Sequence, residues 1–477
     1  MDKPQNNLIY QIKDKPPIHR LILFSIQQLL AIMAATIVVP LIVGNGMSQS
    51  AALLGAGIGT IVYLLFTKSR SPVFLGSSFA FLGSMFSAFS GAATVALGYV
   101  GLLIGAAMAG LVYVIIAIVV KFAGVKWINK LMPAVIIGPT VAIIGLSLAG
   151  NAVGDFIGGA ATGGVFVVNG HMAVCMVCGF VTLVATMLAS VYSKKIGRLI
   201  PFIIGILAGY FTACIFYIIG EIGSWETLKI IDFTAFKDLF ATVKFSSFIT
   251  LDKDIYAVAK AWKSFDEVTG TYIMTIFAAY VPVAFVVFAE HLADHKNLSS
   301  IVGKDLLEDP GLTRTLLGDG IGSVAGAVVG GCPNTTYGES IGCVAITKNA
   351  STISIWGAAI AAILISFLAP FMTFLKTIPS CVMGGVCFAL YGFIAVSGLK
   401  MLQKVNLNKN RNLFVASVIL IAGVGGFQLQ FGDVTLRTVA CALILGIVIN
   451  VILSLKKNND DDMSDDLTII ENKKNNE

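Results

Sequence analysis

The sequence predicts an all-α membrane protein of about fourteen transmembrane segments, arranged as two inverted seven-segment repeats. Composition is the first observation behind this prediction: 57% of the 477 residues are hydrophobic and 12% are charged. Soluble domains carry about 25% charged residues, so this chain has too few charges to solvate a globule of its size. The net charge of +6 is too weak a bias to indicate nucleic acid binding.

The second observation is the series of apolar runs. A helix needs about 20 apolar residues to cross a bilayer. Candidate runs cover residues 20–44, 48–67, 72–90, 98–122, 127–150, 171–193, 199–222, 271–293, 314–331, 333–350, 353–375, 378–400, 412–431 and 435–455. The runs 72–90 and 333–350 differ from the others, because both are short, are rich in Gly with Ser or Thr, and follow a proline (Pro72, Pro333).

The third observation is the placement of Lys and Arg, which accumulate on cytoplasmic connections. Basic residues follow every second run, whereas the connections at 44–50 and 91–98 have none. The pattern predicts a protein of the cell membrane with two cytoplasmic tails, 1–19 and 456–477. The repeats are then 20–222 and 271–455, and the mixed-polarity stretch 223–270 is an extracellular loop.

An odd number of segments per half places the second half upside down relative to the first. Secondary transporters often have this plan, with the substrate held near the midplane by discontinuous helices. The two Gly-rich runs occupy the third position of each half, where such interrupted elements correspond.

Two acidic residues stand out within the apolar runs, where an ionisable group costs at least about 2.5–3.5 kcal/mol. Glu290 ends the stretch VPVAFVVFAE near the predicted end of its span, and Glu339 lies among glycines in PNTTYGESIG. His291, Asp294 and His295 follow Glu290 but lack the His-Glu-x-x-His order of zinc proteases. We therefore expect a hydrogen-bond network around Glu290, with no metal and no cofactor.

Several local motifs match a known family: Gln27-Gln28, LGSSFAF at 75–81, AEH at 289–291, KDLLEDPGL at 304–312 and PNTTYGE at 333–339. The family signature continues from Glu339 through Gly342 to Thr347 and Lys348, with Ser340 in place of the usual Asn. On these residues the chain resembles the bacterial uracil permeases of the nucleobase–ascorbate transporter family, also called nucleobase:cation symporters. A second departure is Asp294, where these permeases often have His; here His295 comes one residue later.

The resemblance implies a core domain of segments 1–4 and 8–11, a gate domain of segments 5–7 and 12–14, short strands at the start of segments three and ten, and usually a homodimer. It also implies that Glu290 and Glu339 bind the base, that backbone near Phe79 and Gly338 completes the contacts, and that Glu290 couples transport to a proton. Asp294 and His295 are the expected neighbours in the proton relay.

The chemistry of uracil fits these groups. The base is flat and neutral, with two N–H donors for carboxylates and two carbonyls for backbone N–H groups. Hydrogen bonds to a charged partner contribute about 1.5–3 kcal/mol, and an aromatic side chain such as Phe79 or Tyr337 can cover a ring face. An acid at position 339 is typical of uracil-type members, whereas purine-type members commonly carry Gln.

The sequence leaves other functions open. The same architecture could carry xanthine or another purine, use sodium in place of the proton, or transport an anion, although two central acids argue against an anion. An intramembrane enzyme built on Glu290, His291 and Asp294 would need a further ligand within the spans, and a channel would conduct without saturating.

Overall fold

The computed structural model describes residues 8–455 apart from 125–131, 162–164, 195, 242, 245–246, 250–254 and 433. The cytoplasmic tail predicted at 456–477 and residues 1–7 of the predicted N-terminal tail lie outside the described residues. Within the described part, nine helical stretches are long and apolar enough to cross a membrane. They are α1 (Ile18–Val43), α2 (Gln49–Phe66), α4 (Val95–Ala123), α6 with α7 (Ala134–Ser147, Ala149–Ile157), α8 (Gly170–Tyr192), α10 (Pro201–Gly223), α13 (Gly270–Val302), α18 (Ser380–Leu402) and α20 (Thr438–Leu455).

Shorter elements complete the membrane region. They are α3 (Leu82–Ser90), α14 (Leu312–Gly330), α15 (Gly338–Thr347), α16 (Thr352–Ser366), α17 (Ala369–Thr377) and α19 (Asn410–Val424), with the strands β1 (Leu75–Ser77), β2 (Asn334–Thr336), β3 (Leu429–Phe431) and β4 (Val434–Leu436). The connections hold α9 (Ile196–Leu199), α11 (Thr234–Ala241) and α12 (Ala257–Ala261). The prediction of a membrane protein with many apolar helices is therefore confirmed.

Helix α13 extends beyond the span predicted for it, which ended at residue 293. It begins where the Thr269 hydroxyl accepts a hydrogen bond from the backbone N–H of Tyr272 (3.1 Å) and ends at Val302, followed by left-handed Gly303. A side-chain cap of this kind satisfies a helix N–H that has no intrahelical partner. Glu290 therefore lies well inside the helix and not near its end, because the polar residues after it find partners within the protein.

Two other predicted runs are interrupted. The run 412–431 stops being helical at Val424, where Gly425 and the left-handed Gly426 (φ 68°) turn the chain into the β3–β4 hairpin. Glycine adopts this conformation without the steric cost that a Cβ imposes. The run 353–375 forms two helices, α16 and α17, that part at Phe367 and Leu368.

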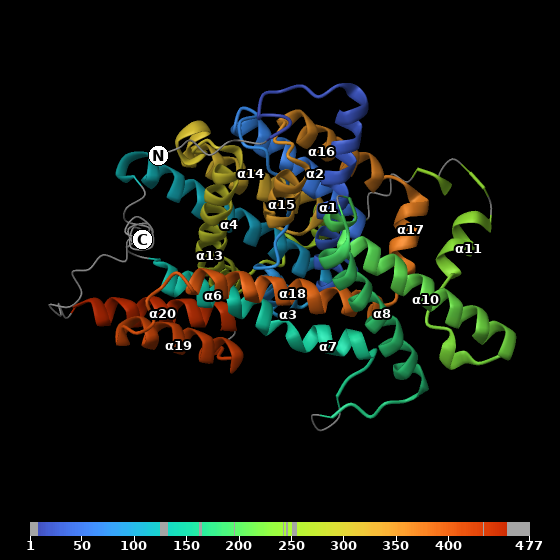
Figure 1. Ribbon diagram of the computed structural model, residues 1–477. Coiled ribbons are helices and arrows are strands. Elements are labelled where there is room, and N and C mark those ends of the chain that lie inside the picture. Colours follow the sequence, from blue (N-terminus) through green and yellow to red (C-terminus); the bar gives the residue numbers. More distant parts are fainter. Residues whose placement is uncertain are drawn as a thin grey trace.

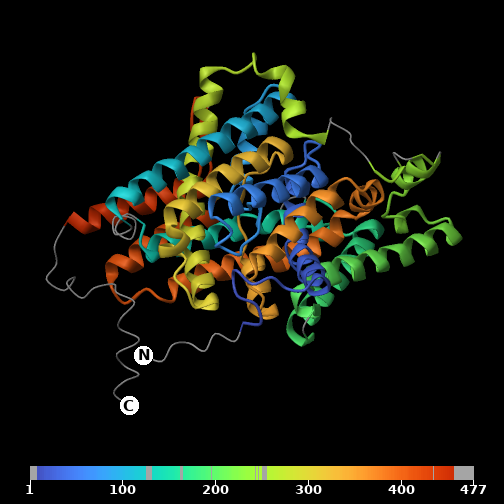
Figure 2. The same ribbon diagram turned by 90° about the horizontal axis from the view of Figure 1, so that it is seen from above.

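The helices gather in two groups (Figure 1). One group contains α1–α4 and α13–α16, most of which lie in the upper part of the view, with α3 below them. The other contains α6–α10 and α18–α20, which extend below and to the right. Seen from above, α4, α14 and α2 run side by side in the first group (Figure 2).

Close backbone approach joins α2 to α14. A Cβ on Gly55 would lie 2.4 Å from the carbonyl oxygen of Gly326, and one on Gly59 would lie 2.7 Å from that of Gly322. Small residues allow membrane helices to approach this closely, where van der Waals contact replaces the hydrophobic driving force that lipid removes. The first group is thus a tightly packed frame around its interrupted segments.

The interrupted segments meet in a two-stranded antiparallel sheet. Leu75 pairs with Thr336, Gly76 with Thr335 and Ser77 with Asn334. Strand β1 leads to α3 and strand β2 to α15, so each segment is half strand and half helix. These strands lie within the two Gly-rich runs that the sequence analysis singled out.

Candidate functional site

The crossing of β1 and β2 is reinforced beyond the sheet itself. The Tyr337 hydroxyl donates to the backbone carbonyl of Ser77 (2.6 Å), and the Ser78 N–H donates to the carbonyl of Pro333 (2.9 Å). Glu339 follows directly, in the first turn of α15. A helix N-terminus presents unpaired N–H groups and a partial positive charge, so the sequence here folds into a site with donors beside an acid.

One face of α13 supplies the other acids. Glu290 and Asp294 are one helical turn apart, and the Thr336 hydroxyl of β2 donates to Asp294 Oδ2 (2.8 Å). Asp294 and Glu339 lie near enough to Glu290 to repel its charge. The structure therefore brings the two predicted glutamates into one region.

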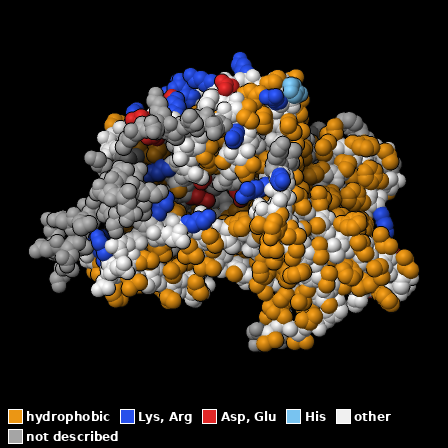
Figure 3. Space-filling view, viewed as in Figure 1, with side chains coloured by type: hydrophobic (Ala, Val, Ile, Leu, Met, Phe, Trp, Pro, Cys, Tyr) orange, Lys and Arg blue, Asp and Glu red, His pale blue; other side chains and the backbone are white. Residues whose placement is uncertain are grey.

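This region reaches the surface. Glu290, Asp294 and Glu339 are half-buried and Gly338 is exposed, although their neighbours in β2 are buried. Figure 3 shows acidic side chains recessed in a hollow, where α13 and α15 lie in the matching view of Figure 1, with Lys and Arg side chains around it. Irregular backbone at membrane depth is tolerated where it lines a cavity, and this hollow meets that condition.

A fourth acid of the region, Asp319 on α14, was missed by the sequence analysis. It is buried, and its Oδ2 lies 2.7 Å from His291 Nδ1, while His291 Nε2 lies 3.0 Å from the Thr315 hydroxyl. The signal was present, since Asp319 interrupts an apolar run just as Glu290 does. His291 is thus bound to α14 and does not face the glutamates as a free ligand.

His295, predicted for proton coupling, points to another neighbour. Its Nδ1 donates to the carbonyl of His291 (2.9 Å), and its Nε2 lies 2.7 Å from the Tyr63 hydroxyl and 3.3 Å from that of Ser71. The structure shows no hydrogen bond from His295 to Glu290 or Asp294 among the residues it describes. The contact of His295 with Tyr63 joins α13 to α2.

Ser340, which departs from the family signature, has two partners. Its hydroxyl accepts from the backbone N–H of Phe74 (2.9 Å) and from the side-chain amide of Gln28 on α1. Ser340 therefore ties α15 to the entrance of β1 and to α1. A hydroxyl is small enough to fit between these buried groups, which are 0–3% exposed.

Phe79 lies between β1 and α3, half-buried at the side of the second helix group. Its ring meets that of Tyr391 on α18 edge to face, with centroids 6.2 Å apart. Such pairs stabilise by about 0.5–1.5 kcal/mol beyond their buried area. Phe79 thus joins the two helix groups beside the site.

Within the described part of the chain, no group of three or more His, Cys, Asp or Glu side chains could hold a metal ion.

The fold is shared with transmembrane domains of known structure. The transmembrane domain of the cyanobacterial bicarbonate transporter BicA superposes with a TM-score of 0.59 at 15% identity, covering 94% of this chain and 100% of that one. The murine anion transporter Slc26a9 in the inward-facing state gives 0.61 at 12% identity, covering 93% and 69%. The chain therefore has the polytopic fold of these two transmembrane domains.

Sequence comparison gives the family. The pattern of the Permease family (Xan_ur_permease) matches residues 19–432. The uracil permease of Bacillus caldolyticus is 38% identical over 456 residues, 95% of each chain. The uracil permease of Bacillus subtilis (strain 168) is 37% identical over 471 residues, 98% of this chain and 99% of that one. That of Escherichia coli (strain K12) is 36% identical over 448 residues, 93% and 94%.

The chain belongs to this permease family, and the resemblance found in its motifs is confirmed. Membership indicates a membrane-embedded transporter rather than an enzyme.

Proposed function

We propose that this permease imports uracil together with a proton by alternating access. The observation that carries the proposal is the meeting of two strand-helix segments, one from each half of the chain, beside three carboxylates that are accessible from a hollow. Discontinuous helices near the midplane are the substrate sites of many secondary transporters. The uracil permeases named above, similar over nearly the whole chain, support the choice of substrate.

Each residue has a role in this proposal. Glu290 and Glu339 accept hydrogen bonds from the two N–H groups of the base. Backbone N–H groups near Phe79 and Gly338 donate to its carbonyls, and Gly338 suits this because no atom lies within 4 Å of the position of a Cβ there. The Phe79 ring covers a face of the base. The Tyr337 hydroxyl is engaged with Ser77, so Tyr337 shapes the site through its ring.

Proton coupling is assigned to Glu290. The acids near Glu290 make it unfavourable for every carboxylate to carry a charge, so base binding and protonation are thermodynamically linked. Asp294 is the neighbour that shares this charge balance. His295 acts on Glu290 indirectly, through the α13 backbone, because it donates a hydrogen bond to the His291 carbonyl.

Movement follows from the two helix groups. We assign the group of α1–α4 and α13–α16 as the core and the group of α6–α10 and α18–α20 as the gate, with both termini cytoplasmic. The core then moves against the gate, and the base travels with the core. A homodimer fits the same proposal, because the gate is the part that must be held still in the membrane.

The test is uracil uptake into vesicles that contain the purified permease. An inward pH gradient should drive accumulation, and a sodium gradient at constant pH should not. Unlabelled xanthine and sulfate, added in excess, should leave uptake of labelled uracil unchanged. Accumulation driven by the sodium gradient would show that sodium, and not the proton, is the coupling ion. Competition by xanthine or sulfate would show that uracil is not the preferred substrate.

A further inference from the structure

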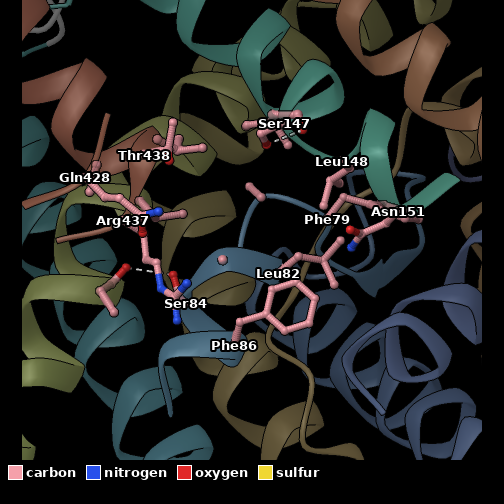
Figure 4. A pocket seen from close by; sticks show the side chains of 17 residues that line it. Phe79, Leu82, Ser84, Phe86, Ser147, Leu148, Asn151, Gln428, Arg437 and Thr438 are labelled. Carbon is pink, nitrogen blue, oxygen red and sulfur yellow. Dashed lines mark hydrogen bonds between the residues drawn. The ribbon is translucent and has the colours of Figure 1, made fainter. Parts of the chain in front are cut away.

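A cavity lies between the two helix groups, next to Phe79 and separate from the central acids. Its volume is about 190 Å³. It is lined from the core side by α3 and α13 and from the gate side by α6, α7, α20 and the segment that precedes α20 (Figure 4). Phe79 lines it, but Glu290 and Glu339 do not. The cavity is therefore a second chamber that shares one aromatic residue with the proposed base site.

Arg437, in the wall of this chamber, connects gate to core. Its Nε donates to the Ser87 hydroxyl (2.9 Å) and its Nη2 to that of Ser90 (2.8 Å). Ser87 and Ser90 lie on α3, the helical half of the first interrupted segment, whereas Arg437 immediately precedes α20. Among the described residues that line the chamber, Arg437 is the one with a charge. Its two hydrogen bonds thus join the parts that must separate if core moves against gate.

The lining suits a neutral, planar heterocycle. The side-chain amides of Asn151 and Gln428 offer donors and acceptors, and Arg437 has N–H donors beyond the two engaged with serines. Phe79 and Phe86 supply flat apolar surface. A cavity of about 150 Å³ accommodates benzene, so a six-membered base fits. The charge of Arg437 disfavours a cation in the same space.

The position of the chamber places it toward the outside. Helix α3 ends at Ser90, directly before the connection 91–98 that carries no Lys or Arg. The hairpin before Arg437 follows α19, whose other end adjoins the basic stretch at 400–411. Connections without basic residues face away from the cytoplasm.

We propose that this cavity is an outer antechamber that binds the nucleobase before it reaches the central site, and that Arg437 closes it by bonding Ser87 and Ser90. The inference rests on the proposed function and orientation. The base enters when the Arg437 bonds break, meets the amides and the guanidinium, and passes Phe79 toward the glutamates. The hollow at the acids is the exit on the other face.

The chain offers a reporter site for a test. Gly83 lines the chamber, and a Cβ placed there meets no atom within 4 Å. Gly83→Cys therefore adds a thiol to the cavity, and a membrane-impermeant maleimide applied to intact cells measures its access from outside. The same cells without the new cysteine give the background from the native thiols. Asn151→Cys, on the gate side, repeats the measurement where the first variant does not reach the membrane.

Four results are expected. External uracil slows labelling of the thiol added by Gly83→Cys, and still does so with Glu339→Gln present, because the antechamber binds the base independently of the central acid. Arg437→Gln speeds labelling at least about fivefold, as the loss of two hydrogen bonds from a charged donor implies. Ser87→Ala with Ser90→Ala reproduces the increase. Lys376→Gln, an exposed cation on α17, does not change the rate.

The inference is overturned if uracil does not slow labelling either with the native Glu339 or with Glu339→Gln. It is also overturned if Arg437→Gln, like Lys376→Gln, leaves the labelling rate unchanged. A thiol in the chamber that the reagent cannot reach from outside would also overturn it. Uracil uptake by the unmodified permease is measured in parallel. Failure of that uptake removes the proposed function, whereas normal uptake with no effect of uracil or Arg437→Gln removes the antechamber alone.

Discussion

The two interrupted segments share one design and differ in one charge. Each follows a proline and forms a three-residue strand before a short helix, of 9 residues in α3 and 10 in α15. The first turn of α3 has no acidic residue, whereas the first turn of α15 contains Glu339. The first segment instead offers Phe79, which lies between its strand and its helix.

The two segments therefore share a backbone arrangement but supply different chemical groups. The antiparallel strands join the two segments in one short sheet, and each half of the chain contributes one strand to it. The second segment then supplies the acceptor for an N–H, while the first supplies an aromatic surface and backbone donors. Substitutions that exchange or remove these contributions test the comparison directly.

Removing the charge of the second segment should have the largest effect. Glu339→Gln keeps the size of the side chain but loses a charged acceptor, which contributes about 1.5–3 kcal/mol, so uracil uptake should fall at least tenfold. Glu308→Gln, in the exposed π-helical turn Leu307–Gly311 before α14, is the matched control and should retain uptake. Normal uptake by Glu339→Gln at equal expression would show that the two segments do not differ in the way we describe.

Disturbing the crossing of β1 and β2 should have the second-largest effect. A Cβ on Gly76 would lie 2.3 Å from the ring of Tyr337, so Gly76→Ala forces the two segments apart. Overpacking of this kind costs about 1–3 kcal/mol, and both the thermal stability of the purified permease and its uptake should fall. Gly83→Ala, on the same segment but facing open space, should preserve stability. Equal stability of the two variants would mean that β1 and β2 can move apart without destabilising the protein.

A smaller change removes only one hydrogen bond between the segments. Tyr337→Phe deletes the hydroxyl that donates to the Ser77 carbonyl and leaves the ring in place. The loss of a neutral hydrogen bond costs about 1 kcal/mol, so uracil affinity should weaken about fivefold in an equilibrium binding measurement. Tyr192→Phe, exposed at the end of α8, serves as the control. Unchanged affinity would mean that the paired strands align the two segments without help from the Tyr337 hydroxyl.

The smallest effect is expected at the entrances of the segments, which also differ. Arg70 precedes Pro72 and pairs with Asp309 (2.7 Å), whereas Gly331 and Cys332 precede Pro333. Hydrogen bonds from Lys304 and then Arg70 lower the pKa of Asp309 to about 2. Because the folded pKa is depressed, this stabilisation is complete above the unfolded value near 4 and is lost as pH falls toward 2. Asp309→Asn should therefore lower the melting temperature by at most about 2 °C.

That decrease should be the same from pH 8 to pH 5 and should shrink below pH 4, where Asp309 of the unfolded wild-type chain begins to take up a proton. Thermal unfolding of the detergent-solubilised protein at several pH values measures it. Asp266→Asn, exposed before α13, gives the baseline. A decrease that varies between pH 5 and pH 8 would contradict the low pKa of Asp309.

Much of the site could be found from the sequence because membrane insertion makes charge rare and therefore conspicuous. Glu290 and Glu339 stood out in apolar runs, and the Gly-rich runs after Pro72 and Pro333 contain the strands. The same rule covers Asp319, which the sequence analysis passed over. The direction of His295 could not be found in this way, because neighbouring positions on a helix point to different partners.

By itself the sequence determined that this chain resides in a membrane, where its interrupted segments fall and which family it belongs to. Composition, run length and local motifs decide these properties, and none depends on which helices touch. Only the tertiary structure decided that His291 pairs with Asp319, that Ser340 joins Gln28 to Phe74 and that Arg437 reaches Ser87 and Ser90. Such partners are 28 to 350 positions apart, and they meet because close helix packing and the pairing of two three-residue strands fix where each side chain points.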